Sequence, residues 1–199
     1  MCGRYALFSV DLLRNLGVEL PQGLPPARYN IAPTQRIAIR RKESLEPARW
    51  GLIPHWKKTL DGPPLFNARV ETVAEKPSFR DAYQSGRCVV PMDGYYEWKD
   101  SQPHFVTGPD GLLWAAGLWA SGLGQLSATV VTAAATEEME WLHHRQPKFL
   151  LPDEVQAWLA GADLGGPTSV RGLSTYPVDK AVGNVRNDYP GLIEPVDKS

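Results

Sequence analysis

The second residue of the chain, Cys2, carries the most distinctive chemistry in the sequence. A small residue here favours removal of the initiator methionine, which would leave a cysteine with a free α-amine beside its thiol. Such an aminothiol captures aldehydes, because the amine forms an imine and the thiol then closes a thiazolidine ring. An α-amine has a pKa of about 7.7–8.0, so part of it is nucleophilic near neutrality. The alternative is a small residue without function at a frayed terminus.

Two further segments place polar groups where a reaction could use them. Glu97 lies between aromatic residues, and a buried carboxyl acquires a raised pKa that suits a general acid or base. An ion pair with an arginine on a neighbouring strand explains Glu97 equally well. Asn67 and Arg69 share one face of an expected strand, where the amide could orient a carbonyl. A loop asparagine beside a surface arginine is the simpler interpretation of that pair.

The histidines and cysteines do not have metal-ligand spacing. His143 and His144 are adjacent and point in different directions on a helix, so at most one of them enters a site. His55 and His104 stand apart in the sequence, and Cys88 is interpreted as a buried, inert thiol within a strand. The sequence therefore predicts no metal and no cofactor.

Composition narrows the class of protein. The 199 residues are 43% hydrophobic and 22% charged, which is typical of a globular chain. No apolar run approaches the ~20 residues of a membrane helix, and the first residues lack the layout of a secretion signal. With only two cysteines, we expect a reducing, cytoplasmic location and no membrane association.

The net charge is close to zero but unevenly distributed. It totals −1, which argues against a protein that coats nucleic acid by bulk charge. Residues 1–100 nevertheless hold 15 basic and 11 acidic side chains, against 6 and 11 in residues 101–199. A local basic face is compatible with this split. Trp56 beside two lysines could stack on a base of single-stranded nucleic acid there.

The elements that must position these groups are mostly strands. Alternation predicts a strand over residues 36–40, with 48–53 as its pairing partner, and the turn signal at Asp93-Gly94 joins strands over 87–91 and 95–98. Two more apolar strands are expected over 112–119 and 128–132. Short helices are expected over residues 9–17, 78–85, 136–145 and 153–159, with a loop over 57–64. No regular βαβ alternation is present. The pattern indicates an α+β fold of mainly antiparallel, twisted or barrel-like sheet with several short helices.

The order of these features resembles the SOS-response-associated peptidase (SRAP) family of abasic-site processing proteins. The resemblance runs from Met1 to about Pro195, so one such domain is expected over residues 1–199, with its core at about 2–195. The matching segments are residues 1–5 (MCGRY), 28–34 (RYNIAPT), 50–54 (WGLIP), 67–72 (NARVET), 91–98 (PMDGYYEW), 131–134 (VTAA), 143–147 (HHRQP) and 181–185 (AVGNV).

The resemblance implies a protein that crosslinks to abasic sites in single-stranded DNA, with a monomer as the acting form. Cys2 corresponds to the nucleophile once Met1 is removed, a step that the family name implies is autocatalytic. Asn67 corresponds to the group that orients the cysteine and the sugar, and Glu97 to the acid/base of imine formation. His143, rather than His144, corresponds to the group that protonates the sugar oxygen as the ring opens. A DNA lyase side reaction follows when the thiol does not close the ring.

The resemblance also implies a DNA-binding set. Within this set, the arginines correspond to residues that contact phosphates, the proline and the tryptophan to residues that stack on bases, and the threonine to a backbone contact with the DNA. These residues are Arg4, Pro33, Trp56, Arg69, Thr132 and Arg145. Gln146 and Lys57 depart from the family pattern and bear on stacking and strand preference. A cysteine peptidase using Cys2, or a non-catalytic single-strand binder, are the alternative functions.

Overall fold

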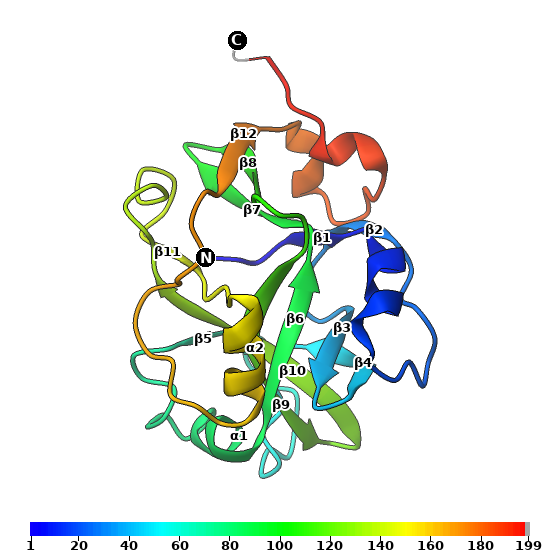
Figure 1. The fold of residues 1–199 in the computed structure, drawn as a ribbon, viewed down its shortest axis with the longest axis vertical. Coiled ribbons are helices and arrows are strands. Elements are labelled where there is room, and N and C mark those ends of the chain that lie inside the picture. Colours follow the sequence, from blue (N-terminus) through cyan, green and yellow to red (C-terminus); the bar gives the residue numbers. More distant parts are fainter. Residues whose placement is uncertain (198–199) are drawn as a thin grey trace.

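The computed structural model describes residues 1–197, which form two β-sheets with short helices on their outside (Figure 1). The strands are β1 (Tyr5–Leu7), β2 (Arg28–Ile31), β3 (Arg36–Arg41), β4 (Ser44–Trp50), β5 (Asn67–Arg69), β6 (Arg87–Met92), β7 (Gly94–Lys99), β8 (Gln102–Thr107), β9 (Leu113–Gly122), β10 (Gln125–Ala134), β11 (Arg145–Pro147) and β12 (Ser174–Pro177). The α-helices are α1 (Arg80–Ser85) and α2 (Pro152–Leu159), and the 3-10 helices are η1 (Val10–Leu16), η2 (Lys180–Gly183) and η3 (Pro190–Ile193).

Five strands close into a barrel, because β10 pairs with a neighbour on each side. The order around the barrel is β10-β4-β3-β6-β9, and β9 pairs again with β10. All these pairings are antiparallel except that of β10 with β4. The far end of β10 leaves the barrel and is flanked by β5, which is parallel to it, and by β11. Two short strands that carry predicted site residues are thereby fixed on the same long strand.

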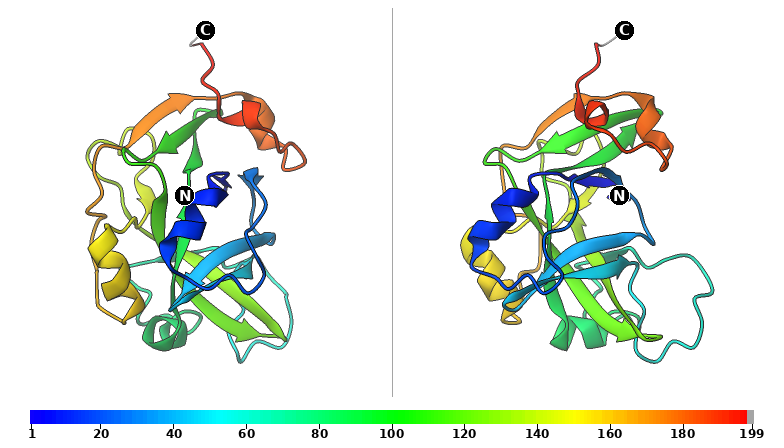
Figure 2. Two further views of the ribbon diagram at one scale, coloured as in Figure 1. Left: turned by 45° about the vertical axis from the view of Figure 1, so that its right-hand side comes forward. Right: turned by 90° about the vertical axis from the view of Figure 1, so that its right-hand side faces the viewer.

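The second sheet has the order β12-β8-β7-β1-β2 and is antiparallel throughout. It lies across one end of the barrel, as the turned views show (Figure 2). The predicted α+β class with mainly antiparallel, barrel-like sheet is confirmed. Within residues 1–197, no helix is long and apolar enough to cross a membrane.

The chain crosses from the barrel to the second sheet at Asp93 and Gly94. The Asp93 carboxylate accepts hydrogen bonds from the backbone N–H groups of Phe8 and Ser9, at 2.6 and 2.9 Å. The predicted strands 87–91 and 95–98 both exist, but each pairs within a different sheet rather than with the other. This crossing sets the position of β7, which carries Glu97.

Gly94 has no room for a side chain, so we expect Gly94→Ala to be destabilising. A Cβ there would lie 2.4 Å from the Val106 carbonyl oxygen and 2.5 Å from the Phe105 ring. Overpacking of this kind typically lowers the free energy of unfolding by about 1–3 kcal/mol. Gly183→Ala is the matched control, since a Cβ added there would meet nothing within 4 Å. Urea unfolding of both variants checks this, and equal midpoints would contradict it.

Several predicted elements are confirmed, one is wrong in part and one is absent. Strands 36–40, 112–119 and 128–132 and the helix over 153–159 are present, and Gly17 ends η1 in the left-handed conformation (φ 66°). Residues 51–53 lie outside β4, because at Gly51 (φ 135°) the backbone turns away from the strand.

The helix predicted over 136–145 is absent, and a series of turns takes its place. This segment connects the antiparallel strands β10 and β11, so its two ends must meet. The Ala135 N–H donates to the His144 carbonyl at 2.9 Å, and the Thr136 N–H donates to the Gln146 side chain at 3.0 Å. A regular helix over this segment would hold the two ends apart, so it cannot form where the ends are hydrogen-bonded to each other.

Candidate active site

The N-terminal segment enters the protein and is fixed there. Cys2 has no exposed surface, which rules out a frayed terminus. The side-chain amide of Asn67, at the start of β5, donates to the Cys2 carbonyl oxygen at 3.0 Å. Tyr5 follows in β1, where it pairs with Tyr95 of β7. Because β1 is hydrogen-bonded to β7, the terminus lies against the strand that carries Glu97.

The α-amine of Met1 lies between two of the predicted catalytic side chains. Its nitrogen is 2.9 Å from Glu97 Oε2 and 3.1 Å from His143 Nε2. The Glu97 side chain is 7% exposed, whereas that of Met1 is 49% exposed. The ion-pair partner of Glu97 is thus the terminal amine and not an arginine on a neighbouring strand. The structure brings Cys2, Asn67, Glu97 and His143 together at one place.

His143 is held at its other ring nitrogen. Its Nδ1 lies 3.2 Å from the Arg145 carbonyl oxygen and 2.9 Å from the Arg145 backbone nitrogen. In the tautomer that donates Nδ1–H to the carbonyl, the lone pair of Nε2 faces the amine. Burial lowers the pKa of His143, although the neighbouring Glu97 opposes this effect. His144 stacks on the outer face of the ring, with the two ring centroids 4.4 Å apart. A neutral imidazole in this position can accept a proton from the amine.

The Cys2 thiol is protonated at neutral pH while Met1 is attached. Burial raises its pKa to about 12, and the charge of Glu97 adds to the shift. The positive terminal amine and the backbone N–H of Arg4 act in the opposite direction. A cation close to the thiol therefore favours its ionisation, while the apolar surroundings resist it. Cys88 is also fully buried and, as predicted, lies in a strand.

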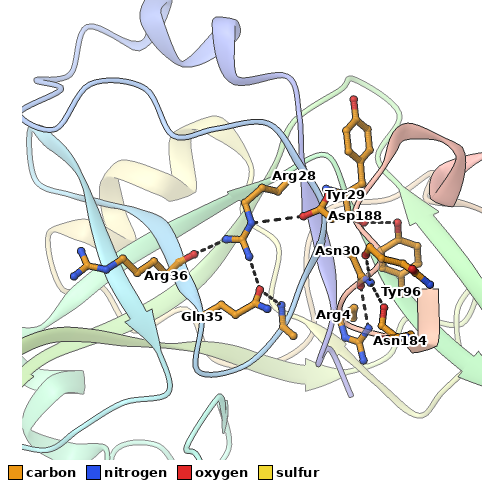
Figure 3. A network of polar contacts seen from close by, with 11 residues as sticks. Arg4, Arg28, Tyr29, Asn30, Gln35, Arg36, Tyr96, Asn184 and Asp188 are labelled. Atoms are coloured by element: carbon orange, nitrogen blue, oxygen red, sulfur yellow. Dashed lines mark hydrogen bonds and ion pairs between the residues drawn. The ribbon is translucent and has the colours of Figure 1, made fainter. Parts of the chain in front are cut away.

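Arg4 belongs to a polar network that links the N-terminal and C-terminal segments (Figure 3). Its Nη1 donates to the Asn30 side chain at 2.9 Å and to the Val182 carbonyl at 2.6 Å. The buried Asn30 amide also donates to the carbonyls of Val182, Asn184 and Asn187. Asn30 was not predicted as a site residue, although it lies in one of the matching segments. Its long-range partners could not be read from the sequence.

Arg145 is buried beneath the site rather than displayed on it. Its two terminal nitrogens donate to the Glu71 carboxylate at 2.7 and 3.0 Å, and one also donates to the Thr132 carbonyl at 2.9 Å. Arg69 pairs with Thr132 across β5 and β10, and its side chain is 58% exposed. Glu71, another residue that was not predicted, joins the two arginines, with Arg69 Nε 3.9 Å away.

The remaining two predicted DNA contacts lie in loops. Trp56 is 48% exposed in the long connection between β4 and β5, and Pro33 is half-buried in the turn after β2. No hydrogen bond or ion pair of the described residues joins either of them to Cys2, Asn67, Glu97 or His143. Their part in binding stays a prediction. Among residues 1–197, no group of three or more potential ligand side chains could hold a metal ion.

The ion pair of Glu71 with Arg145 predicts a pH-dependent loss of stability in Glu71→Gln. Hydrogen bonds from Arg145 hold the pKa of the Glu71 carboxyl below its ordinary value. Its stabilising contribution is therefore complete above about pH 5 and is lost as the pH falls through the lowered pKa. We expect Glu71→Gln to lower the free energy of unfolding at pH 7 by about 1–2 kcal/mol. This is less than for a fully buried pair, because the carboxylate is partly exposed.

Urea unfolding at pH 7 and at pH 3 measures this difference. The gap between parent and variant should narrow at the lower pH, since the parent carboxyl is then increasingly protonated. Glu75→Gln is the control, because Glu75 is exposed and its side chain forms no described ion pair. A gap that is the same at both pH values would contradict the assigned charge on Glu71.

Comparison with known proteins agrees with this architecture. A crystal structure of a protein from Bacteroides thetaiotaomicron superimposes with a TM-score of 0.84 at 20% identity, covering 98% of this chain and all of that one. In sequence, the abasic site processing protein YoqW of Bacillus subtilis is 34% identical over 98% of this chain and 99% of its own length. YedK of Escherichia coli, also an abasic site processing protein, is 33% identical over 98% of this chain and 100% of its own length. The family profile described as SOS response associated peptidase (SRAP) matches residues 1–185. The resemblance seen in the sequence is confirmed, and the chain belongs to the SRAP family.

Proposed function

We propose that this protein recognises abasic sites in single-stranded DNA and forms a covalent thiazolidine crosslink to them through Cys2. The observation that carries the proposal is that Glu97 and His143 lie at the N-terminus beside Cys2, where they hold the Met1 amine at 2.9 and 3.1 Å. Imine formation requires an amine, a group that removes its proton and a group that protonates the departing oxygen. The names of the relatives YoqW and YedK, abasic site processing proteins, support the substrate class.

The first step in this proposal is removal of Met1. Water hydrolyses the peptide bond between Met1 and Cys2, which releases methionine and creates the Cys2 α-amine. We propose that the protein carries out this hydrolysis on itself, with Glu97 and His143 holding the amine of the departing residue. Loss of the half-exposed Met1 then opens the otherwise buried Cys2 to solvent.

The second step joins the protein to the lesion. His143 protonates the ring oxygen of the deoxyribose, which opens to the aldehyde. The Cys2 amine adds to the C1′ carbon, and loss of one water gives the imine, with Glu97 managing the proton. The positive iminium replaces the terminal ammonium near the thiol and lowers the thiol pKa in the same way. The sulfur then adds to the imine carbon, and its proton passes to the nitrogen.

An intact strand is not a substrate, because it offers no aldehyde. When ring closure fails, the imine is open to β-elimination, which breaks the strand 3′ to the lesion and constitutes a lyase reaction. We assign phosphate contacts to Arg4 and Arg69. Arg145 and Thr132, expected as DNA contacts from the family resemblance, are buried and bonded to each other, so we assign them to holding Glu71 beside Arg69. Pro33 and Trp56 stack on bases in this proposal, and the acting form is a monomer.

Two observations weigh against the other functions. A cysteine peptidase acting on foreign peptides needs a thiolate, and in the chain that carries Met1, burial raises the pKa of the Cys2 thiol to about 12. A binder that relied on charge alone would suit a basic protein, whereas the net charge here is −1.

A denaturing gel tests the proposal. Protein beginning at Cys2 is incubated with three oligonucleotides, namely a single strand with one abasic site, the same strand intact, and the abasic strand in a duplex. We expect a denaturant-resistant band of higher mass with the abasic single strand and none with the intact strand. Equal bands with intact and abasic strands, or no band at all, would refute it.

A further inference from the structure

The chain that still carries Met1 already holds a reactive group in the site. The Met1 α-amine contacts both Glu97 and His143, the same two side chains that the proposed reaction uses. Met1 is 48% exposed, so this amine is open to the solvent although the thiol behind it is fully buried.

We propose that the Met1-bearing chain is itself active on abasic DNA, as a lyase that works through the Met1 α-amine and leaves no stable crosslink. The inference rests on the proposed function only for its substrate class, the aldehyde of an abasic site. It assigns a separate activity to the unprocessed chain. Removal of Met1 then converts a strand-cleaving form into a crosslinking form.

The chemistry balances without any further reactant. His143 accepts a proton from the ammonium, and the free amine adds to C1′ of the sugar. Water leaves and an imine forms. The Glu97 carboxylate, no longer paired with an ammonium, removes a proton from C2′. The C3′–O bond breaks, the phosphate departs with the electron pair, and hydrolysis of the unsaturated imine releases the amine.

Ring closure by sulfur is excluded in the unprocessed chain. The Met1 nitrogen and the Cys2 sulfur are separated by a whole peptide unit, so attack of sulfur on the imine carbon would close an eight-membered ring. That ring would contain a planar peptide bond, which is trans here because the described chain has no cis peptide. The Asn67 amide also holds the Cys2 carbonyl at 3.0 Å, which restrains the peptide from rotating. The imine therefore has elimination or hydrolysis as its only outcomes.

The experiment compares chains whose first residue is set by cleavage of an N-terminal fusion. One begins at Met1, one at Cys2, and one carries a glycine before Met1, which moves the amine one residue away from Glu97. A fourth begins at Met1 and carries Cys2→Ala, which retains the Met1 amine but has no thiol that could close a ring. Intact mass establishes that Met1 is present throughout, and thermal melting establishes that each chain is folded.

Each chain is incubated with the abasic single strand, with and without borohydride, which reduces an imine to a stable amine. We expect both Met1-bearing chains to give a borohydride-dependent adduct that maps to the Met1 nitrogen, together with strand cleavage. The glycine-extended chain should form the trapped adduct and cleave the strand at least tenfold more slowly. Absence of the trapped adduct from the Met1-bearing chains, or equal rates with the glycine extension, would overturn the inference.

The outcomes separate the inference from the proposed function. If the chain beginning at Cys2 crosslinks without borohydride but the Met1-bearing chains trap no imine, only the inference fails. If the chain beginning at Cys2 forms no adduct, the proposed function fails, whereas trapping on Met1 would still establish the lyase. Trapping on internal lysines rather than on Met1 also counts against the inference.

Discussion

Cys2→Ala protein that has lost Met1 is expected to form no crosslink that survives denaturation. The alanine chain keeps its α-amine, so the imine still forms, but no sulfur is present to close the ring. The expected change is complete loss of the stable adduct, with an imine that borohydride still traps. Lyase cleavage of the strand should increase at the same time, because elimination no longer competes with ring closure.

The matched control for this variant is Cys88→Ala. Both cysteines are fully buried and burial raises both thiol pKa values, but Cys88 lies in β6 of the barrel. Cys88→Ala should crosslink like the parent. Gel analysis with and without borohydride measures both variants. A Cys2→Ala chain that forms a stable adduct as well as the parent does would show that the thiol plays no part.

Glu97→Gln is expected to slow crosslinking by about 10²–10⁴-fold, the range for loss of a general acid or base. The substitution keeps the size of a side chain that is only 6% exposed, but it removes the charge that pairs with the amine. The amide can neither accept the proton released during addition nor deliver one to the departing hydroxyl. Single-turnover rates with excess protein measure the change in the chemical step.

A second carboxylate variant separates the role of Glu97 from a general effect of lost charge. Glu46 pairs with Arg41 at the β3–β4 hairpin, which has no described contact with the four central residues. Glu46→Gln should crosslink at the parent rate. If Glu97→Gln reacts as fast as the parent while remaining folded, the acid/base assignment is wrong.

Much of the sheet could be predicted from local pattern. Alternation in the sequence identified β3, and an apolar run identified β10. Neither strand has one solvent-facing side, because residues 37–39 of β3 and 127–133 of β10 are all buried. The three-residue strands β1 and β11 were not identified, since so short a segment carries no periodicity, whereas β5 was expected as the strand that carries Asn67 and Arg69. They exist because long strands elsewhere in the chain provide hydrogen-bond partners.

The same distinction applies to the site, where several residues could be recognised from the sequence but the contacts that support them could not. The residue types of Cys2 and Glu97 indicated chemistry, and the family resemblance named Asn67 and His143 as their partners. The contacts that support them were not predictable, because they join distant parts of the chain. Arg145 bonds Glu71 across 74 residues, and Asn30 bonds the Val182 carbonyl across 152. No local pattern encodes such pairs.

The intact mass of the protein after incubation with a single-stranded oligonucleotide carrying one abasic site tests the central claim most directly. The account predicts one adduct, with the mass of the chain lacking Met1 plus the DNA minus one water. The same adduct should be absent from Cys2→Ala without a reducing agent. No adduct from folded protein that has lost Met1, or an equal adduct from Cys2→Ala, would contradict the account.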